Sequence, residues 1–439
     1  MLNHGGMLPA HNGEKRRLLL LATTTGYQTR AFAEAAAKMG VSVVLGTDRC
    51  RVLDDPWQDG AVPLRFENPE ESARRIADLA RTQPLQGIVA LGDCTPPTAA
   101  RASRMLGLLH HPPEAADICR DKYRSRQRLC TKGLNVPRFV RFPLERDSEE
   151  IMKSDASAFG YPCVLKPLAL SASRGVIRAD NPREFAHAFS RIRTLLRSPE
   201  IRVTRQAAND FIQVEEYIEG TEIAVEGIVN RGRLKVLAIF DKPDPLVGPF
   251  FGETIYVTPS AMPEETQAQV AEALERAVQA LGLYHGPLHA ELRINSQGLW
   301  IMEVAARSIG GLCSRVLRFR SPDLGENISL EELIIRLALG ETLEGIDREK
   351  AASGVMMIPV SEAGILRDVE GVEKARATPG IEEIIITAKP SQKLVPLPEG
   401  SSYPGFIFAR GPSSEYVQQA LRHSHQYLRF VLSPALPVV

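Results

Sequence analysis

The stretch PLHAELRINSQGLWIMEV, residues 287–304, alternates apolar and polar residues on both sides of the turn-forming run from Asn295 to Gly298. This alternation predicts two antiparallel strands joined by a tight turn. If the loop has three residues and ends at Gly298 in a left-handed conformation, Glu291 lies directly opposite Glu303. Opposed carboxylates repel each other, and a hard divalent cation would offset that repulsion. The alternatives are a two-residue loop, which would put the two glutamates on opposite faces, and an exposed hairpin with two solvated glutamates.

Further polar residues flank this hairpin. Arg307 follows Glu303 by four positions and precedes Gly310-Gly311. An arginine beside a metal ion and a glycine loop can stabilise charge on a transferred phosphoryl group or an oxyanion, whereas elsewhere an arginine more often forms an ordinary salt bridge. The three-residue loop would also place His289 opposite Ala305. There His289 either lines a substrate site or belongs to the core.

Two stretches before the hairpin suit a nucleotide. Lys166 ends an apolar strand and is followed by Pro167 and by the run Ser171-Ala172-Ser173-Arg174-Gly175-Val176. Small residues around a glycine let backbone N–H groups approach phosphate oxygens, and a lysine adds positive charge. Residues 213–222 combine apolar positions with carboxylates, which suits an adenine edge, and Glu222 is placed to reach ribose hydroxyls. A solvated anchor lysine and an amphipathic strand with a charged turn are the alternatives.

The composition excludes several classes of protein. The 439 residues correspond to roughly three domains at about 150 residues each. Lys plus Arg and Asp plus Glu both number 53, so the balanced charge does not favour nucleic acid or an anionic membrane as the main partner. The six scattered cysteines predict reduced thiols rather than disulfides or a zinc site. No segment approaches about 18 apolar residues, so we expect a cytoplasmic protein without a membrane span, with a flexible tail over residues 1–14.

Hydrophobic periodicity predicts three successive units. In the first, short apolar strands alternate with helices, which is typical of a parallel-sheet α/β domain. The loop at 23–27 after its first strand lacks a dinucleotide fingerprint. In the second, strands dominate but helices are predicted at 121–132, 263–281 and near 330–339. The third is predicted to be an α/β cap of its own, with a turn-rich connection at Gly364–Leu366. The expected boundaries are 15–110, 111–345 and 352–432.

In their order and spacing, the residues between about 110 and 320 resemble the ATP-grasp family of ATP-dependent carboxylate–amine ligases. The resemblance implies an N-terminal Rossmann-like domain and a central ATP-grasp fold, in which two α+β subdomains clasp ATP. It implies that Glu291 and Glu303 hold Mg²⁺ or Mn²⁺. In the family, two lysines contact the ATP phosphates, a glycine-containing loop covers them, a hinge binds adenine and a following glutamate binds ribose. The matching residues here are Lys122, Lys166, Ser171, Ser173, Arg174, Gly175, Glu215, Glu216, Ile218 and Glu222.

One departure points to a branch of the family. Many members place an asparagine two residues after the second glutamate, where this chain has Ala305. The form Glu303-Val304-Ala305-Ala306-Arg307 is similar to the L-amino acid ligases, which join unprotected amino acids into dipeptides, and the C-terminal segment is similar to the cap of that branch. The resemblance implies that a carboxylate is activated as an acyl phosphate and joined to an amine. Arg307 would be catalytic, and the residues placed at the substrates are Glu253, His289, Gly310 and Gly311.

Several rival functions remain at this point. A biotin-carboxylase-type subunit or a purine-pathway ligase would share the ATP residues and differ in substrate. An ATP-binding regulatory protein without turnover is favoured only by Ala305. A redox α/β enzyme is disfavoured by the missing dinucleotide fingerprint. The expected partners are small-molecule carboxylate and amine substrates, and a homodimer would suit the resemblance.

Overall fold

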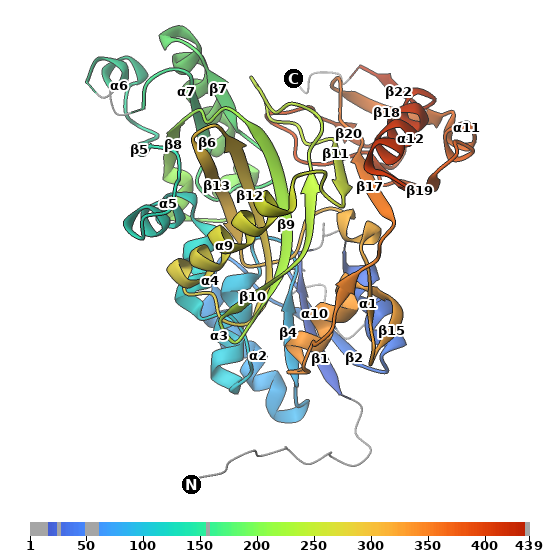
Figure 1. The fold of residues 1–439 in the computed structure, drawn as a ribbon. Coiled ribbons are helices and arrows are strands. Elements are labelled where there is room, and N and C mark those ends of the chain that lie inside the picture. Colours follow the sequence, from blue (N-terminus) through green and yellow to red (C-terminus); the bar gives the residue numbers. More distant parts are fainter. Residues whose placement is uncertain (1–15, 24–27, 49–60, 155–158, 435–439) are drawn as a thin grey trace.

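The computed structural model describes residues 16–23, 28–48, 61–154 and 159–434. The predicted tail over 1–14, most of the loop at 23–27 and Cys50 lie outside this part of the chain. Figure 1 shows an N-terminal sheet in blue at the bottom, long green and yellow strands in the middle and an orange-to-red C-terminal region. A parallel sheet is thus followed by antiparallel sheets with helices, which confirms the predicted multidomain α/β and α+β class.

The N-terminal part is a four-stranded parallel sheet in the order β3-β2-β1-β4. Leu18 and Leu20 of β1 pack on helices α1 and α10, whereas Leu19 and Leu21 pack on α2 and α3. Both faces are covered, which explains why this strand is apolar throughout. Helix α10 comes from much later in the chain and lies beside β4 and α1 (Figure 1), so it fastens the N-terminal sheet to the central region. The elements are β1 (Arg17–Ala22), α1 (Thr29–Lys38), β2 (Ser42–Thr47), β3 (Val62–Pro63), α2 (Pro69–Thr82), β4 (Gly87–Ala90), α3 (Pro96–Leu106) and α10 (Leu330–Ala338).

A smaller antiparallel sheet follows in the order β5-β8-β6-β7. Helix α7 (Pro182–Leu196) packs on it through Phe185 and Phe189, and the Phe185 ring stacks on Phe159 with centroids 5.3 Å apart. Sequence analysis assigned no helix here, although Asn181 caps the helix by accepting a hydrogen bond from the Glu184 backbone N–H. The strands are β5 (Phe139–Pro143), β6 (Cys163–Pro167), β7 (Ile177–Ala179) and β8 (Phe211–Glu216).

The centre of the molecule is an eight-stranded antiparallel sheet in the order β13-β12-β9-β10-β11-β17-β21-β19. At its β13 to β10 end, helix α9 (Glu264–Leu281) covers one face and buries apolar residues of β9 and β12 such as Val225 and Leu288. Because side chains alternate along a strand, every second residue of β9 and β12 points to the opposite face. That face is largely polar. The strands are β9 (Thr221–Asn230), β10 (Arg233–Asp241), β11 (Ile255–Thr258), β12 (Gly286–Asn295), β13 (Gly298–Ala305), β17 (Ala352–Met357), β19 (Ile381–Ile386) and β21 (Gly405–Gly411).

The hairpin of β12 and β13 corrects one expectation and confirms another. Its loop has two residues, because Asn295 pairs with Gly298, so the predicted three-residue loop is wrong. A β-bulge then inserts Met302 between the pairs Leu292–Ile301 and Glu291–Glu303. The extra residue reverses the alternation of side chains, so Glu291 and Glu303 still lie opposite each other, and His289 lies opposite Ala305 as predicted.

The strands of the C-terminal segment are divided between two sheets. Its strands β17, β21 and β19 extend the central sheet, since β17 pairs with β11. Helices α12 (Ser414–Gln426) and α11 (Val372–Arg376) pack beside these strands. A second small sheet in the order β20-β18-β22 holds β18 (Gly364–Glu370), β20 (Lys393–Leu394) and β22 (Arg429–Ser433), so Gly364–Leu366 begins a strand and is not the predicted turn. The boundary between 345 and 352 stays a prediction.

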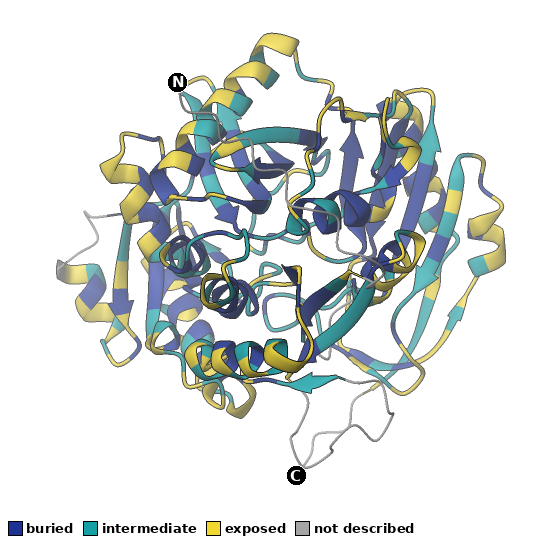
Figure 2. Ribbon diagram, turned by 90° about the horizontal axis from the view of Figure 1, so that it is seen from below, coloured by how far each residue is buried: buried dark blue, intermediate teal, exposed yellow. Residues whose placement is uncertain are grey.

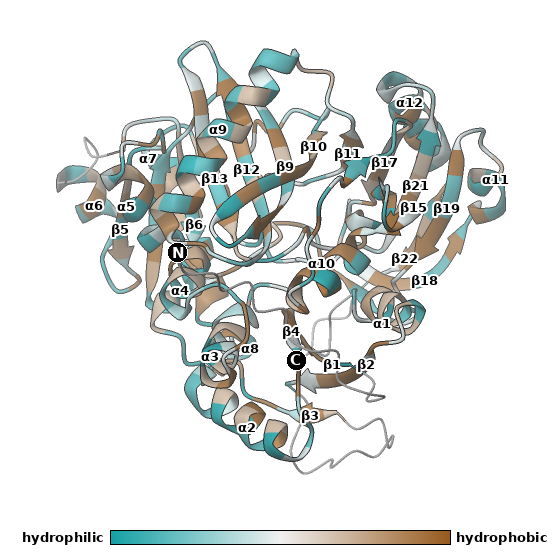
Figure 3. Ribbon diagram, turned by 60° about the horizontal axis from the view of Figure 1, so that its bottom comes forward, coloured by the Kyte–Doolittle hydropathy of each residue, from teal (hydrophilic) through white to brown (hydrophobic). Residues whose placement is uncertain are grey.

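Burial and hydropathy follow the same layers. In Figure 2 the central strands are largely dark blue and the outward faces of the peripheral helices are yellow. Figure 3 shows brown apolar residues concentrated on the strands. Among the described residues, no helix has the length and apolar character needed to span a membrane. The remaining elements are α4 (Pro113–Arg120), α5 (Lys122–Thr131), α6 (Ser148–Ser154), α8 (Pro199–Arg202), β14 (Arg318–Ser321), β15 (Gly325–Ser329), β16 (Asp347–Arg348) and the 3-10 helices η2 (Ala207–Asp210) and η3 (Cys313–Val316).

Two histidines, the partly buried His110 and the buried His111, lie where the N-terminal part meets β12. The Tyr284 backbone N–H donates to His111 Nδ1 at 3.1 Å, and His111 Nε2 lies 3.2 Å from the Pro287 carbonyl oxygen, a pairing that requires a neutral ring. Burial lowers the pKa of His110 to about 4 and that of His111 to about 3.

Acidification is therefore expected to destabilise the protein from about pH 6.5 downward. As the pH falls, each histidine binds a proton in the unfolded chain at a higher pH than in the folded protein. Its contribution to the free energy of unfolding is therefore complete above pH 6.5. Below that it declines, by up to about 1.4 kcal/mol per pH unit, toward pH 4 for His110 and pH 3 for His111. Thermal unfolding of the wild type and a His111→Asn variant at pH 7.5, 6.5 and 5.5 checks this. The variant should lose less stability per pH unit, and equal slopes would contradict the assignment.

Candidate active site

One cavity of about 470 Å³ brings the predicted site residues together. It lies between the carboxyl ends of β1 and β4, the small sheet and the polar face of the central sheet. Its volume is in the range of ordinary ligand pockets. Gly175 is the only predicted site residue absent from its lining, which includes Lys122, Lys166, Ser171, Ser173, Arg174, Glu215, Glu216, Ile218, Glu222, Glu253, His289, Glu291, Glu303, Arg307, Gly310 and Gly311.

Lys166 and Glu215 form a buried ion-pair cluster with Arg126. The Lys166 ammonium contacts Glu215 Oε2, Arg126 Nε donates to Glu215 Oε1 at 2.7 Å, and Gln213 Nε2 donates to the same oxygen at 2.6 Å. Burial alone would raise the pKa of Glu215, but Arg126 and Lys166 outweigh it and lower the pKa to about 2. Burial, with Arg126 and Lys122 nearby, lowers the pKa of Lys166 despite the carboxylate. Arg126 also donates to the carbonyl of Met302, so one side chain supports both the lysine and the β-bulge.

Glu216, the next residue, has a different environment. Its carboxylate accepts hydrogen bonds from Arg138 Nε at 2.6 Å and from the Arg138 backbone N–H at 3.1 Å, at the rim of the cavity. Alternation along β8 explains the difference, because successive residues face opposite sides of the strand. Sequence analysis placed both glutamates at the adenine, and that role stays a prediction for each.

Lys122 stands between the phosphate-loop region and the paired glutamates. It is the first residue of α5, whose N-cap Asp121 accepts hydrogen bonds from the backbone N–H groups of Tyr123 and Arg124. The Lys122 ammonium donates to the Leu170 carbonyl at 3.0 Å and lies 3.3 Å from Glu303 Oε2.

Glu291 and Glu303 provide a donor set that fits a hard divalent ion. They face each other across β12 and β13, and 24% and 29% of their side chains is exposed in the cavity. Two carboxylates with room for phosphate oxygens and water suit Mg²⁺. These two residues, with Lys122 beside Glu303, would hold the ion and the phosphate charge near each other.

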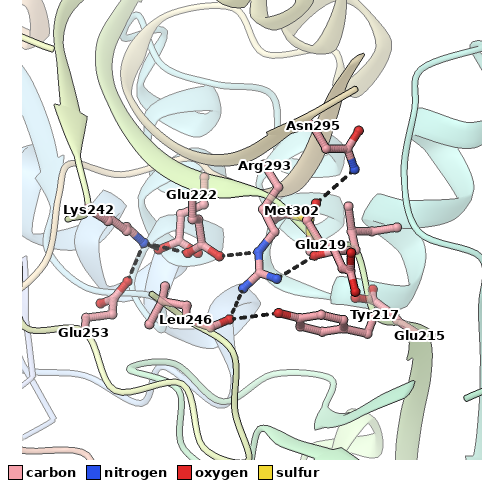
Figure 4. Close-up of polar contacts among 12 residues, drawn as sticks. Glu215, Tyr217, Glu219, Glu222, Lys242, Leu246, Glu253, Arg293, Asn295 and Met302 are labelled. Atoms are coloured by element: carbon pink, nitrogen blue, oxygen red, sulfur yellow. Dashed lines mark hydrogen bonds and ion pairs between the residues drawn. The ribbon is translucent and has the colours of Figure 1, made fainter. Parts of the chain in front are cut away.

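Two buried cations that sequence analysis missed organise the other carboxylates (Figure 4). Lys242 Nζ contacts Glu222 Oε1 at 2.8 Å, Glu253 Oε1 at 2.7 Å and Glu291 Oε1 at 3.0 Å. Arg293 donates through Nε to Glu222 Oε2 at 2.8 Å. Burial opposes the charge on Lys242, but the three carboxylates raise its pKa well above the usual value.

A sequence signal for Lys242 did exist. Like Lys166, it ends an apolar strand region and precedes a proline, Pro243. The structure also bears on Glu253, which was expected to meet a substrate ammonium group. Its Oε1 accepts hydrogen bonds from both Lys242 and, at 2.6 Å, the Tyr256 hydroxyl. Burial opposes ionisation of Glu253, but Lys242 outweighs it and lowers the pKa.

The far end of the cavity holds Arg307 beside the carboxyl edge of the parallel sheet. Arg307 Nε donates to Asp93 Oδ1 at 2.6 Å, and Asp93 follows β4. Ligands often bind at this edge of an α/β sheet, which is a signal for Asp93 that sequence analysis did not use. Burial would raise the pKa of Asp93, but Arg307 lowers it.

His289 has a buried carboxylate behind it. Its Nδ1 lies 3.2 Å from Glu226 Oε2, on the neighbouring strand, and the Ile309 backbone N–H donates to the same oxygen at 3.0 Å. Glu226 Oε1 has no hydrogen-bond partner among the described residues, and burial raises the pKa of this carboxyl. Glu226 was not predicted. His289 thus reaches the cavity while its other side is held by the core.

In the loop Ser171–Val176, φ is positive at Ala172, Ser173 and Gly175, a conformation that glycine adopts readily and that is uncommon for the other two residues. Gly175, however, donates its backbone N–H to the Pro398 carbonyl at 2.8 Å, so this group is directed at the C-terminal segment and not at the cavity. Arg174 Nε likewise donates to the Glu399 carbonyl at 2.7 Å. Arg174 still lines the cavity, and the role of both residues at the ATP phosphates stays a prediction.

Three family models match consecutive parts of the chain. They are an ATP-grasp N-terminal domain at residues 33–109, an ATP-grasp domain at 159–316 and an L-amino acid ligase C-terminal domain 2 at 356–433. The solved structure of an L-amino acid ligase from Bacillus licheniformis is similar over 95% of this chain and 99% of that one, with a TM-score of 0.80 and 26% identity.

Curated relatives match over shorter regions. Alanine–anticapsin ligase of Bacillus subtilis is 27% identical over 64% of this chain and 62% of its own length, which is less than two thirds of that protein. Carnosine synthase 1 of Gallus gallus is 27% identical over 72% of this chain and 35% of its own length. Together with the domain matches and the fold, these similarities place the chain among the ATP-dependent ligases of the ATP-grasp family, with the C-terminal domain of the L-amino acid ligases.

Proposed function

We propose that the protein uses ATP to join a carboxylate to an amine, with two amino acids as substrates and a dipeptide as product, releasing ADP and phosphate. The observation that supports this most strongly is the single cavity. It unites two lysines, the opposed pair Glu291 and Glu303, and Arg307 at the carboxyl edge of the parallel sheet. The matched C-terminal domain of L-amino acid ligases supports amino acids as the substrate class.

In this proposal the nucleotide lies along the small sheet and the hinge after β8. Lys122 and Lys166 neutralise phosphate oxygens, and Ile218 and the backbone beside it border the adenine. Glu222 receives the ribose, although Lys242 and Arg293 already occupy part of its carboxylate. Glu291 and Glu303 hold Mg²⁺, which when bound neutralises phosphate charge.

The remaining residues act on the substrates. The substrate carboxylate attacks the γ-phosphorus, which forms an acyl phosphate and releases ADP. The amine of the second substrate then attacks the acyl carbon and loses a proton as phosphate leaves. Arg307, fixed by Asp93, stabilises the negative charge that develops on the acyl oxygen. The loop at 171–176, covered by Pro398 and Glu399, keeps water away from the acyl phosphate. Gly310 and Gly311 leave space for substrate side chains. A homodimer remains part of the proposal, and light scattering of the purified protein tests it.

The test is phosphate release with ATP and Mg²⁺ across all amino acids, singly and in pairs, with mass spectrometry of the products. We expect release that requires two amino acids and a product with the mass of their dipeptide. Hydroxylamine in place of the second amino acid should trap the activated carboxylate as a hydroxamate. Release with a single carboxylate and a non-amino-acid amine would keep the ligase and replace the dipeptide. No release and no hydroxamate with any substrate would contradict the proposed reaction.

A further inference from the structure

Three carboxylates converge at one point beside the proposed metal pair. Glu222 on β9, Glu253 before β11 and Glu291 on β12 place one oxygen each within 4.8 Å of one another. This spacing would suit the ligands of one hard divalent ion. Acidic groups that approach so closely repel strongly unless a cation lies among them.

The cation in this structure is a side chain. Lys242 Nζ lies 2.7 to 3.0 Å from one oxygen of each of the three glutamates (Figure 4). An ammonium group has three N–H donors, so each carboxylate can receive one hydrogen bond. The Lys242 side chain is 3% exposed, and its nitrogen also lies 4.9 Å from the Tyr256 ring centroid. If Lys242 left this position, each of the three carboxylates would therefore lose one hydrogen-bond donor and its nearest ammonium charge.

The charges around this point are nearly balanced by the chain itself. Arg293 pairs with the second oxygen of Glu222, and its two other donor nitrogens bond the carbonyls of Ile218 and Leu246 at 2.6 and 2.8 Å. The Tyr256 hydroxyl donates to Glu253. Glu303, by contrast, has only Lys122 as an ion-pair partner among the described residues. Positive charge is thus supplied by the protein on the Glu222 side of Glu291 and is incomplete on the Glu303 side.

We propose that Lys242 is a resident cation that occupies the centre of the Glu222–Glu253–Glu291 group and keeps divalent ions out of it. A metal ion then reaches Glu291 only from the side of Glu303. The exclusion of divalent ions from the Glu222–Glu253–Glu291 group does not depend on the reaction that the protein catalyses. The binding of a metal ion between Glu291 and Glu303 rests on the proposed function. Lys242 is a positioning residue, since it acts through the glutamates it holds.

Removal of the charge should convert the acidic group into a metal site. A Lys242→Met variant keeps the length and apolar stem of the side chain and leaves the three carboxylates to bind a cation. We expect it to bind one more Mn²⁺ per chain than the wild type without nucleotide, with an affinity for that ion at least tenfold higher than any wild-type site. Electron paramagnetic resonance of free Mn²⁺ and titration calorimetry measure both quantities. Lys235→Met, on β10 and outside the cavity, is the matched control and should bind Mn²⁺ like the wild type.

Two further variants make the result specific. Lys242→Met combined with Glu253→Gln removes one of the three ligands and should lose the additional ion. Lys242→Met combined with Glu303→Gln should keep it, and loss of the ion in this variant would place it outside the acidic group and overturn the proposal. An unchanged number of bound ions and unchanged affinity in a folded Lys242→Met protein would also overturn it.

Folding provides an independent measurement. If Lys242→Met is unstable in EDTA, Mn²⁺ should raise its thermal unfolding midpoint well above any shift of the wild type, and the Glu253→Gln combination should abolish that rise. Absence of a Mn²⁺-dependent rise contradicts the proposal. Because none of these experiments contains ATP or a substrate, failure of the ligase assay would not affect them.

Discussion

Glu303→Gln is expected to lower ligase turnover on the order of a thousandfold while the protein stays folded. Glu303 lies opposite Glu291, and Lys122 is its one ion-pair partner among the described residues. Glutamine therefore removes one metal ligand and leaves a single cation, Lys122, without its carboxylate. A metal ion stabilises the transition state of phosphoryl transfer by several kcal/mol, and a change of about 1.4 kcal/mol in the activation free energy changes the rate tenfold. Removal of one of two opposed charges also relieves repulsion in the hairpin, so stability should change little.

Steady-state phosphate release and the thermal unfolding midpoint together test this expectation. Glu272→Gln, an exposed glutamate on the outer face of α9, is the matched control and should keep wild-type turnover. Increasing Mg²⁺ should recover part of the lost rate if binding of the ion is what Glu303 provides. If a folded Glu303→Gln variant keeps more than a tenth of the wild-type turnover, the assignment of Glu303 as a metal ligand is wrong.

Glu215→Gln should be far more destabilising than Glu216→Gln, although the two residues are neighbours of the same type. Glutamine at 215 leaves Arg126 and Lys166 buried without their counter-ion, and loss of one partner from a buried pair costs about 3–5 kcal/mol. Glu216 pairs with Arg138, whose side chain is 61% exposed, and such surface pairs contribute about 0–1 kcal/mol.

Unfolding by heat and by urea at pH 7 ranks the variants. The stability of Arg126→Met should lie between those of the two glutamate variants. Lys166 and Glu215 then remain as an ion pair without net charge, but the Met302 carbonyl loses its hydrogen-bond donor. The pKa of Glu215 is about 2, below its usual value, so its contribution is present above about pH 4.5 and disappears as the pH falls toward 2. Similar midpoints for the variants at 215 and 216 would contradict the buried cluster.

The hairpin shows how far pattern reasoning reached and where it stopped. Alternation correctly predicted the strands and the facing pair Glu291 and Glu303, but the loop length was wrong and the bulge at Met302 was not foreseen. The two errors cancelled, because a shorter turn and an extra residue each shift the register by one. The bulge is held by Arg126, which lies far away in sequence, so no local pattern could reveal it.

Residue type and spacing identified most of the charged residues that line the cavity, but not the partners behind them. Glu215 and Glu216 look alike in the sequence, since both lie at the end of the same apolar strand, and only the packing of Arg126 and Lys166 distinguishes them. Lys242 and Asp93 were missed for a related reason. Each has its effect through a charge contributed by another strand or loop, and such pairs depend on tertiary structure.

The N-terminal parallel sheet was the most predictable part of the fold, because short apolar strands alternate with amphipathic helices at regular spacing. Helix α10 was also predicted, but its docking on β4 and α1 was not, since an amphipathic helix does not specify which face it will cover. Helix α7 was overlooked despite its Asn181-Pro182 start.

The pairing of β11 with β17 limits how this protein could exchange segments with its relatives. Ile255 to Thr258 and Ser353 to Met356 pair as antiparallel strands, although the predicted domain boundary between 345 and 352 separates them in the sequence. In a chimera joined near residue 350, β17 would come from another protein and would have to pair with β11 residue by residue. A mismatch would leave unpaired backbone groups, which favour aggregation. Crossovers that keep both strands from one parent should therefore survive selection more often, so that the two segments are inherited as a unit.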